Sequence, residues 1–366
     1  MTAATLFIIM AVLYCAQGIV LIAGLKRAVP EKAPHYEPRV SVITAARNEE
    51  SNIEACLESL LRIEYPRDKF EIIVVDDNST DATLAIVRKF AKENSNLKVL
   101  SAKQEIDHLR GKANAIAQGI DISSGEIIAM TDADCVVPPT WLRSTVRSYT
   151  GDVGVVAGLT LLQPTGWFAG MQSLDWAYIL AVASAAMALK NPLSCIGNNF
   201  SFRKKAYDEI GGYRKIKFSV TEDFALFKAI THSGRWEYRY PFERETLVFS
   251  IACSSVRELY RQKRRWGVGG KDMPPSALMM MVIAFCFHAL LLFGIFVSID
   301  QKLLLLGLLG KVIGDLVLLS IPLSRTRQLA QLKYFWLFEL YFMLYVLLLP
   351  FAVFLGGRVV WKGRKF

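Results

Sequence analysis

The residue types best suited to chemistry are carboxylates that follow predicted strands. Asp132 and Asp134 lie two positions apart, directly after an apolar segment. Side chains two apart on an extended segment face the same way, so both carboxylates can converge on one point. One or two carboxylates, completed by substrate phosphates, commonly hold Mg²⁺ or Mn²⁺ in proteins. This spacing predicts a divalent-metal site at the two aspartates.

Polar residues also follow the first two predicted strands. Residues 45–49 (AARNE) end the first strand, and residues 76–79 (DDNS) end the second. Ligands of a doubly wound sheet bind outside the carboxyl ends of its strands, so these clusters are expected to line a nucleotide crevice. Residues 78–81 (NSTD) taken alone also suit an ordinary surface turn. A GxGxxG fingerprint is absent from the first turn, which counts against a nicotinamide or flavin enzyme.

A third acidic cluster, residues 221–223 (TED), has two interpretations. Asp223 can serve as a general base that takes a proton from an acceptor hydroxyl. Alternatively, Thr221 caps a helix, and Glu222 and Asp223 suit the positive end of its dipole. Both interpretations can hold at once.

A basic and aromatic cluster, residues 262–266 (QKRRW), precedes the C-terminal apolar segments. Basic residues next to a membrane span usually contact lipid headgroups. Alternatively, Trp266 can stack on a sugar while Arg265 holds a leaving diphosphate.

The hydrophobic pattern predicts the scaffold that positions these clusters. From Val40 to about Val156, short apolar strands alternate with amphipathic helices, which is typical of a parallel, doubly wound sheet. The predicted strands are residues 40–46, 71–76, 98–100 and 126–131, and the predicted helices are residues 50–61, 80–92 and 112–122. Ser79 is the expected N-cap of the second helix.

Apolar segments at both ends of the chain predict membrane helices. Hydrophobic residues make up 53% of the 366 residues and the mean hydropathy is +0.31, which excludes an ordinary soluble enzyme. Residues 6–25 predict a signal anchor, and Lys26 and Arg27 place the following domain in the cytoplasm. A signal peptide is the alternative, although a basic start and a small-residue cleavage site are missing.

Three C-terminal segments, residues 276–298, 303–322 and 335–355, are also predicted spans. Lys311 and Asp315 share a helix face and can pair, either for function or to fix helix packing, and Glu339 and His288 raise the same question. Three spans would place the basic tail, residues 358–366, outside the cytoplasm, whereas the positive-inside rule favours the cytoplasm. One C-terminal segment is therefore expected to be re-entrant or interfacial.

Residues 167–189 are too short in apolar length for a span, so they predict an interfacial or buried helix. The charge balance is +10, which suits cytoplasmic flanks against anionic lipid, and no nucleic-acid module is present. The six cysteines are scattered, so no disulfide framework or zinc site is indicated, and a reducing compartment is expected.

Taken in order, these clusters resemble the membrane-bound glycosyltransferases of family 2, which have a GT-A fold. The matching segments are VSVITAARNEE (40–50), VVDDNSTD (74–81), GKANA (111–115), TDADC (131–135), TED (221–223) and QKRRW (262–266), the last fitting the family's QxxRW. The resemblance covers about residues 39–266. It implies an inverting transfer from a nucleotide-diphosphate sugar, usually UDP-linked, with Mg²⁺ or Mn²⁺ as the cofactor.

The resemblance also implies roles for single residues. Those expected to bind the nucleotide sugar are Ala45, Arg47, Glu49, Asp77, Lys112 and Asp132, with Arg47 standing where many relatives carry Tyr. Asp134, with Asp132 beside it, is the expected metal ligand. Asp223, next to Glu222, is the expected base, and the residues expected to close over the diphosphate and acceptor are Gln262, Arg265 and Trp266. Residues 197–201 (GNNFS) resemble the acceptor-side loop.

The expected architecture is therefore an α/β protein with a doubly wound, mostly parallel GT-A sheet. We expect a signal anchor at residues 1–27, a cytoplasmic catalytic domain with interfacial helices at 38–270, and membrane helices with a basic tail at 276–366. The bacterial inner membrane is the expected location.

Residues 361–364 (WKGR) resemble ceramide glucosyltransferase relatives, which favours a lipid acceptor over a growing polysaccharide. An inactive sugar-nucleotide-binding scaffold and a transporter are the competing hypotheses. The sequence leaves the sugar and the oligomeric state open.

Overall fold

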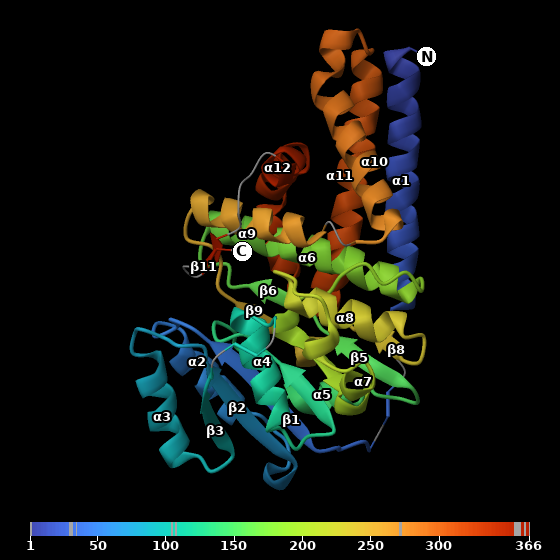
Figure 1. Ribbon diagram of the computed structural model, residues 1–366. Helices are drawn as coiled ribbons and strands as arrows, with labels where there is room; N and C mark the ends of the chain where they lie inside the picture. The colour runs from blue at the N-terminus through green and yellow to red at the C-terminus, as the bar shows by residue number, and fades with distance from the viewer. Residues whose placement is uncertain are drawn as a thin grey trace. The chain divides into compact units, whose positions relative to one another are not determined.

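The computed structural model describes residues 2–28, 32–33, 35–103, 105–106, 108–270, 273–354, 360–361 and 364–365. The chain divides into two compact units (Figure 1). The sheet unit contains Ala28–Leu161 and Ser194–Ile251, and the membrane-helix unit contains Met1–Arg27, Leu162–Leu193 and Ala252–Phe366. The functional boundaries at residues 38, 270 and 276 stay a prediction.

The sheet unit is built on seven strands in the order β3-β2-β1-β4-β7-β5-β8. The strands are β1 Val40–Ala46, β2 Phe70–Asp76, β3 Leu97–Ser101, β4 Ile127–Met130, β5 Val153–Ala157, β7 Phe200–Arg203 and β8 Glu237–Arg239. β1 to β4 are parallel, and β5 is parallel to β8, whereas β7 runs antiparallel to β4 and β5. The predicted doubly wound, mostly parallel sheet is confirmed.

Helices connect these strands. The α-helices of this unit are α2 Ile53–Leu61, α3 Thr83–Glu93, α4 Gly111–Asp121, α5 Trp141–Val146, α7 Lys204–Glu209 and α8 Glu222–His232. The 3₁₀ helices are η1 Arg67–Lys69, η2 Gly197–Asn199, η3 Tyr213–Lys215 and η4 Arg244–Thr246. A separate two-stranded sheet pairs β6 Thr160–Leu162 with β9 Val248–Ser250.

The core of the sheet unit lies on both faces of β1 and β2. Both strands are buried along nearly their whole length, as expected of parallel strands covered on two sides. Leu57 of α2 and Val87 of α3 pack into the same apolar cluster as Val42. On the other face, Gly119 lets α4 approach closely, since an added Cβ would lie 2.9 Å from Ile43 and 3.0 Å from Val75.

The sequence predicted every strand and α-helix from the first strand to the fourth, but it missed η1 and misplaced one helix cap. α3 begins at Thr83 with Ala82 as its N-cap, so the prediction for Ser79 is wrong. The Ser79 hydroxyl instead accepts a hydrogen bond from the Asn48 N–H (3.1 Å), and Asp81 accepts one from the Thr83 N–H (3.0 Å). Ser79 is thus used to join two loops rather than to start the helix.

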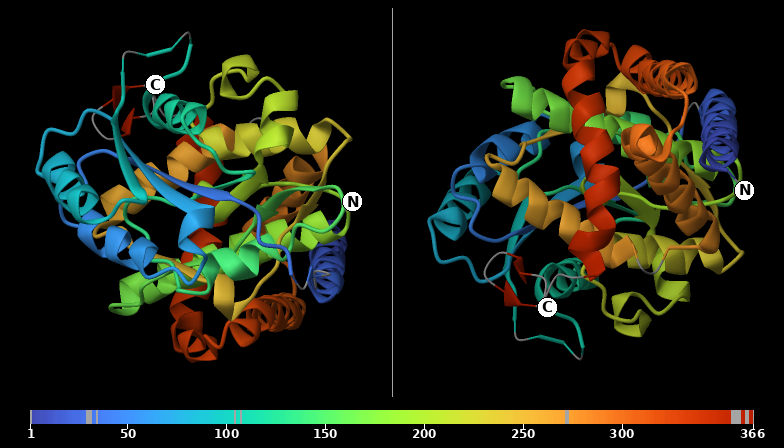
Figure 2. Two further views of the ribbon diagram at one scale, coloured as in Figure 1. Left: turned by 90° about the horizontal axis from the view of Figure 1, so that it is seen from below. Right: turned by 90° about the horizontal axis from the view of Figure 1, so that it is seen from above.

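Among its described residues, the membrane-helix unit contains four helices that are long and apolar enough to cross a bilayer: Ala3–Arg27, Pro275–Val297, Gln301–Arg325 and Leu329–Phe354. One is N-terminal and three are C-terminal, as predicted. The elements of this unit are α1 Ala3–Arg27, α6 Trp167–Ala188, α9 Val256–Gly269, α10 Pro275–Phe293, η6 Gly294–Val297, α11 Gln301–Arg325, η7 Leu329–Tyr334, α12 Phe335–Phe354, β10 Val360–Trp361 and β11 Arg364–Lys365. Within this unit, α1 lies beside α10 and α11 (Figure 2).

α6 has 22 residues but is not one of these four helices. Most of its side chains are buried, and Asp175 is fully buried. Of the two predicted alternatives, an interfacial or a buried helix, the burial of these side chains favours the buried one.

A buried polar cluster links helices of the membrane-helix unit. Lys311 Nζ lies 2.8 Å from Asp315 Oδ2 and also pairs with Glu339 of α12. The hydroxyls of Tyr14 and Tyr178 donate to Asp315 Oδ1 at 3.2 and 3.1 Å. The predicted Lys311–Asp315 pair is confirmed, and Glu339 joins it as a second carboxylate. Residues 358, 359, 362, 363 and 366 of the predicted basic tail lie outside the described residues.

Candidate active site

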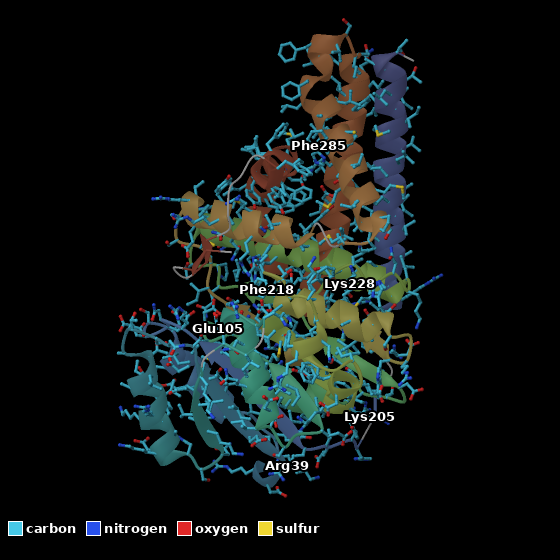
Figure 3. All side chains as sticks on the ribbon, in the orientation of Figure 1. Arg39, Glu105, Lys205, Phe218, Lys228 and Phe285 are labelled. Atoms are coloured by element: carbon cyan, nitrogen blue, oxygen red, sulfur yellow. The ribbon has the colours of Figure 1, made fainter. Side chains whose placement is uncertain are left out.

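Three of the polar clusters meet at one edge of the sheet. β1 lies between β2 and β4, with Ala46 opposite Asp76 in the register. The Thr131 N–H donates to the Ile43 carbonyl (3.4 Å), so the residues after β4 continue beside the end of β1. Figure 3 shows Arg39, which precedes β1, and Glu105, which follows β3, at opposite ends of this sheet. The carboxyl ends of β1, β2 and β4 thus share the Glu105 end, as predicted.

The loops after β1 and β2 are locked together by Arg47. Its Nη1 donates to the carbonyls of Asp77 (2.6 Å) and Asn78 (3.3 Å), and the Asp77 N–H donates to the Ala46 carbonyl (2.8 Å). Asn48 and Asn78 both adopt the left-handed conformation, at φ 52° and 56°. Arg47 therefore fixes the backbone that presents Asp77. A direct contact between Arg47 and a nucleotide stays a prediction.

The other residues predicted to bind the nucleotide lie on the same loops. Ala45 is half-buried near the end of β1, and Asp77 is buried directly after β2. The Glu49 N–H donates to Thr83 Oγ1 (2.7 Å), and its carboxylate accepts from Asn52 Nδ2 (2.8 Å). These bonds orient Glu49 toward the start of α2.

Lys112, in the first turn of α4, joins two of the acidic clusters. Its Nζ lies 2.6 Å from Asp132 Oδ1 and 3.2 Å from Glu222 Oε1. Burial alone would lower the pKa of Lys112, but the carboxylates of Asp132 and Glu222 outweigh burial and raise it. Lys112 is thus held in its charged form between the carboxylates of Asp132 and Glu222, and the sequence segments GKANA, TDADC and TED meet there.

Asp223 is held by two backbone donors. Its Oδ2 accepts from the Gly197 N–H (2.6 Å), and its Oδ1 accepts from the Phe224 N–H (2.8 Å). Burial and the neighbouring Glu222 raise the pKa of Asp223 to about 6, while Lys112 and the two N–H groups oppose that rise. A carboxylate with a pKa near the working pH is well suited to act as a general base.

Gly197, the first residue of the segment that resembles the acceptor-side loop, makes the close approach to Asp223 possible. A Cβ added to Gly197 would lie 2.7 Å from Asp223 Cβ and 2.9 Å from its Oδ2. The asparagines that follow Gly197 turn into the unit: Asn199 accepts from Trp141 Nε1 (3.0 Å) and donates to the Leu159 and Thr246 carbonyls. In the predicted acceptor-side loop, the group bonded to Asp223 is thus the backbone of Gly197.

Thr221 occupies the N-cap position of α8, as the alternative interpretation required, but its side chain does not cap the helix. The Thr221 hydroxyl instead contacts Ser219 Oγ (3.1 Å). The Asp223 carboxylate accepts a hydrogen bond from the Phe224 N–H in the first turn of α8, and the same carboxylate accepts one from the Gly197 N–H.

Asp132 and Asp134 have carboxylate oxygens of the kind that bind divalent cations, and their role as metal ligands stays a prediction. Ser250 Oγ donates to Asp134 Oδ2 (3.2 Å), a contact that was not predicted from the sequence. Among the described residues there is no group of three or more His, Cys, Asp and Glu side chains that could hold a metal. A cation here would therefore need ligands from a substrate, which is how Mg²⁺ and Mn²⁺ are commonly held beside phosphates. The two aspartates fit that arrangement.

Family models match most of the chain. One described as "Glycosyl transferase family 2" matches residues 41–211, and one described as "Glycosyl transferase family group 2" matches residues 127–355, which is more than half of the chain. The chain belongs to glycosyl transferase family 2. The resemblance inferred from the sequence motifs is confirmed.

Two curated relatives of this glycosyltransferase differ in what they make. This chain is 32% identical over 240 residues to a beta-monoglucosyldiacylglycerol synthase from Nostoc sp. (strain PCC 7120 / SAG 25.82 / UTEX 2576). The match covers 64% of this chain and 49% of the relative. This chain is 26% identical over 252 residues to a poly-beta-1,6-N-acetyl-D-glucosamine synthase from Staphylococcus epidermidis, covering 68% and 58%. The chain thus spans about half the length of these relatives.

A solved structure shares the fold of this glycosyltransferase. A mannosyltransferase from Pyrobaculum calidifontis, in complex with GDP-Man and Mn²⁺, superposes with a TM-score of 0.62 at 21% identity. The similarity covers 93% of this chain and 99% of that one. This agrees with the expected GT-A fold.

The remaining predicted residues of the glycosyltransferase, Gln262, Arg265 and Trp266, lie on α9 of the membrane-helix unit. All three are half-buried, and the Trp266 ring lies 5.4 Å from that of Trp176 on α6. Their roles at the diphosphate and the acceptor stay predictions.

Proposed function

We propose that this chain transfers a sugar from a nucleotide-diphosphate sugar to a hydroxyl of a membrane lipid, with inversion at the anomeric carbon and Asp223 as the base. The observation that carries the proposal is the environment of Asp223. Its carboxylate is fixed by the Gly197 and Phe224 N–H groups, and its pKa is raised to about 6. It is therefore both oriented and able to take a proton near neutral pH.

The donor is proposed to bind across the carboxyl ends of β1, β2 and β4. Ala45, Glu49 and Asp77 would contact the base and ribose, and Lys112 would face the diphosphate. Asp132 and Asp134 would hold a divalent cation, which when bound neutralises the charge that develops on the leaving diphosphate. The mannosyltransferase with the same fold contains GDP-Man and Mn²⁺, which supports a nucleotide sugar and a divalent cation here.

The transfer itself needs one proton acceptor and one leaving group. Asp223 takes the proton of the acceptor hydroxyl as its oxygen forms a bond to the anomeric carbon. The bond from that carbon to the diphosphate oxygen breaks on the opposite side, so the nucleoside diphosphate leaves with the electron pair. Gln262, Arg265 and Trp266 are proposed to close over the diphosphate and the acceptor, on the strength of the QxxRW match.

A lipid acceptor is favoured by the glycolipid synthase relative, to which identity is 32%, against 26% for the polysaccharide synthase. Exposed apolar side chains on α9, Val256 and Tyr260, also suit a site near a bilayer surface. Lys26 and Arg27 at the end of α1 support a cytoplasmic catalytic domain, and the bacterial relatives support the bacterial inner membrane as its proposed location. Extension of a polysaccharide is the second candidate, supported by the Staphylococcus relative.

The test uses the full chain in detergent with Mn²⁺ or Mg²⁺, total membrane lipid, and a panel of radiolabelled UDP- and GDP-sugars. Label that enters the organic phase, and is lost when EDTA is added, is the expected result and names the donor. Label in aqueous, high-mass material would instead support the polysaccharide synthase. If no donor releases its nucleotide, the proposal is wrong and a sugar-nucleotide-binding scaffold takes its place.

A further inference from the structure

A buried ion pair connects the QKRRW segment of α9 to α6, and it has no part in the proposed reaction. Lys263, the residue after Gln262, pairs its Nζ with the carboxylate of Asp175 on α6. Their side chains are 5% and 0% exposed. Both residues belong to the membrane-helix unit, where α12 contacts α6 and α9 (Figure 1).

The ammonium group of Lys263 is also enclosed by aromatic rings. It lies 4.3 Å from the centroid of Trp266, one helical turn further along α9, and 5.2 Å from that of Tyr345 on α12. The Trp176 ring, next to Asp175 on α6, lies 5.4 Å from the Trp266 ring. The indole of Trp266 is thus held by a cation and a second indole, while the residue as a whole stays half-buried.

Burying the Lys263–Asp175 ion pair costs free energy of folding, so a role other than stability is expected for it. Two charges taken out of water lose their hydration, and well-packed apolar residues of similar size are often no less stable. Burial lowers the pKa of Lys263 and raises that of Asp175, while each opposes the shift of the other. A cation placed against an indole face gains a directional attraction that an apolar side chain does not provide. What the pair supplies is therefore a fixed orientation of the Trp266 ring.

We propose that Lys263, held by Asp175, is a positioning residue that orients the Trp266 indole so that its remaining surface receives the acceptor. This inference rests on the proposed function, in which Trp266 contacts the acceptor. It assigns a role to a position that the QxxRW pattern leaves open.

The main variant is the double replacement Asp175→Asn with Lys263→Met, which removes both charges and leaves neither unpaired. The assay varies total membrane lipid in mixed micelles, and it records both sugar transfer and nucleotide release without acceptor. We expect the half-saturating lipid concentration to rise about tenfold, with acceptor-independent nucleotide release unchanged. The single variant Lys263→Arg, with Asp175 unchanged, keeps the cation, so its half-saturating lipid concentration should stay close to that of the wild type.

Trp266→Ala provides the comparison that separates this inference from the proposed function. It should raise the half-saturating lipid concentration by itself, and adding the double replacement should raise it no further, because residues that act as a unit are not additive. If Trp266→Ala impairs lipid use but the double replacement does not, the positioning role is wrong and the proposed function stands. If the two effects multiply, Lys263 acts independently of Trp266 and the inference also fails. If Trp266→Ala leaves lipid use unchanged, the proposed acceptor role of Trp266 is itself wrong.

Discussion

Each unit of the molecule contains a lysine placed between two carboxylates. In the sheet unit, Lys112 lies between Asp132 and Glu222, whose side chains are 33% and 10% exposed, while Lys112 itself is 18% exposed. In the membrane-helix unit, Lys311 lies between Asp315 and Glu339, and the three side chains are 1%, 4% and 9% exposed. The same chemical groups are therefore partly open in one cluster and closed in the other.

The difference in exposure indicates which of the two clusters has a structural role and which a functional one. The closed cluster joins α11 to α12 and takes further hydrogen bonds from Tyr14 and Tyr178, so its charges serve one another. Breaking such a pair leaves an uncompensated charge, and that cost fixes the helices in one arrangement. The open cluster joins Asp132, which follows β4, to Lys112 of α4 and Glu222 of α8, beside the oriented Asp223. We infer that the closed cluster around Lys311 is structural and that the open cluster around Lys112 is functional.

Removing the closed lysine is expected to have the largest effect in this comparison. Lys311→Met leaves Asp315 and Glu339 buried without their cation, which should cost about 3–5 kcal/mol of stability. The midpoint of thermal unfolding in detergent measures the loss. The matched control, Lys311→Met with Asp315→Asn and Glu339→Gln, removes all three charges and should recover most of it. An unchanged midpoint for Lys311→Met alone would contradict a structural role.

Gly197→Ala should be the next largest change, and it should affect activity rather than folding. The added methyl group would overlap Asp223, so the carboxylate must move. A displacement of about 1 Å at a reacting group can cost about 100-fold in rate. Steady-state transfer at saturating donor measures it, with Gly234→Ala as control, where a Cβ meets nothing within 4 Å. Because Gly234 has φ +70°, any loss seen in the control reports backbone strain rather than the site.

Lys112→Met opens the functional cluster by removing its cation. We expect kcat/KM to fall about 30-fold at pH 7, because the diphosphate loses a charge partner and the pKa of Asp223 rises further without Lys112. A higher pH should restore part of the rate, since Asp223 then loses its proton again. A loss that is equal at pH 7 and pH 8.5 would show that Lys112 does not act on Asp223.

The wild-type pH profile gives the smallest expected effect. A protonated carboxyl cannot accept a proton, so transfer should rise with pH and level off above about 6, the pKa of Asp223. At pH 5 the rate should be about one tenth of the plateau, because the deprotonated fraction of Asp223 falls about tenfold for each pH unit below its pKa. A rate that does not change between pH 5 and pH 8 would disagree with this assignment.

The sequence predicted most of the fold because its signals are local. The apolar strand segments and four long apolar helices stand out in any short window, and polar residues after a strand must lie at the carboxyl edge of the sheet. The failure at Ser79 is also instructive. A serine before a helix is a good cap candidate, but here its hydroxyl serves Asn48 on a neighbouring loop, and no local pattern contains that contact.

The parts of the site that escaped prediction depend on residues far apart in the chain. Gly197 matters because its N–H meets Asp223, and Ser250 because it reaches Asp134 across more than 100 positions. Lys263 was visible within QKRRW, but its partner Asp175 lies on another helix. Spacing within one segment identifies candidates, whereas only the folded chain shows which of them pair.

The most direct test of the central claim compares donor binding with transfer in Asp223→Asn. The amide keeps the shape of the carboxylate but cannot take the acceptor proton, so donor affinity should stay near that of the wild type while transfer falls by about 1,000-fold or more. Asp121→Asn, at an exposed ion pair with Arg214, is the matched control and should be fully active. Transfer by Asp223→Asn at the wild-type rate would contradict the assignment of Asp223 as the base.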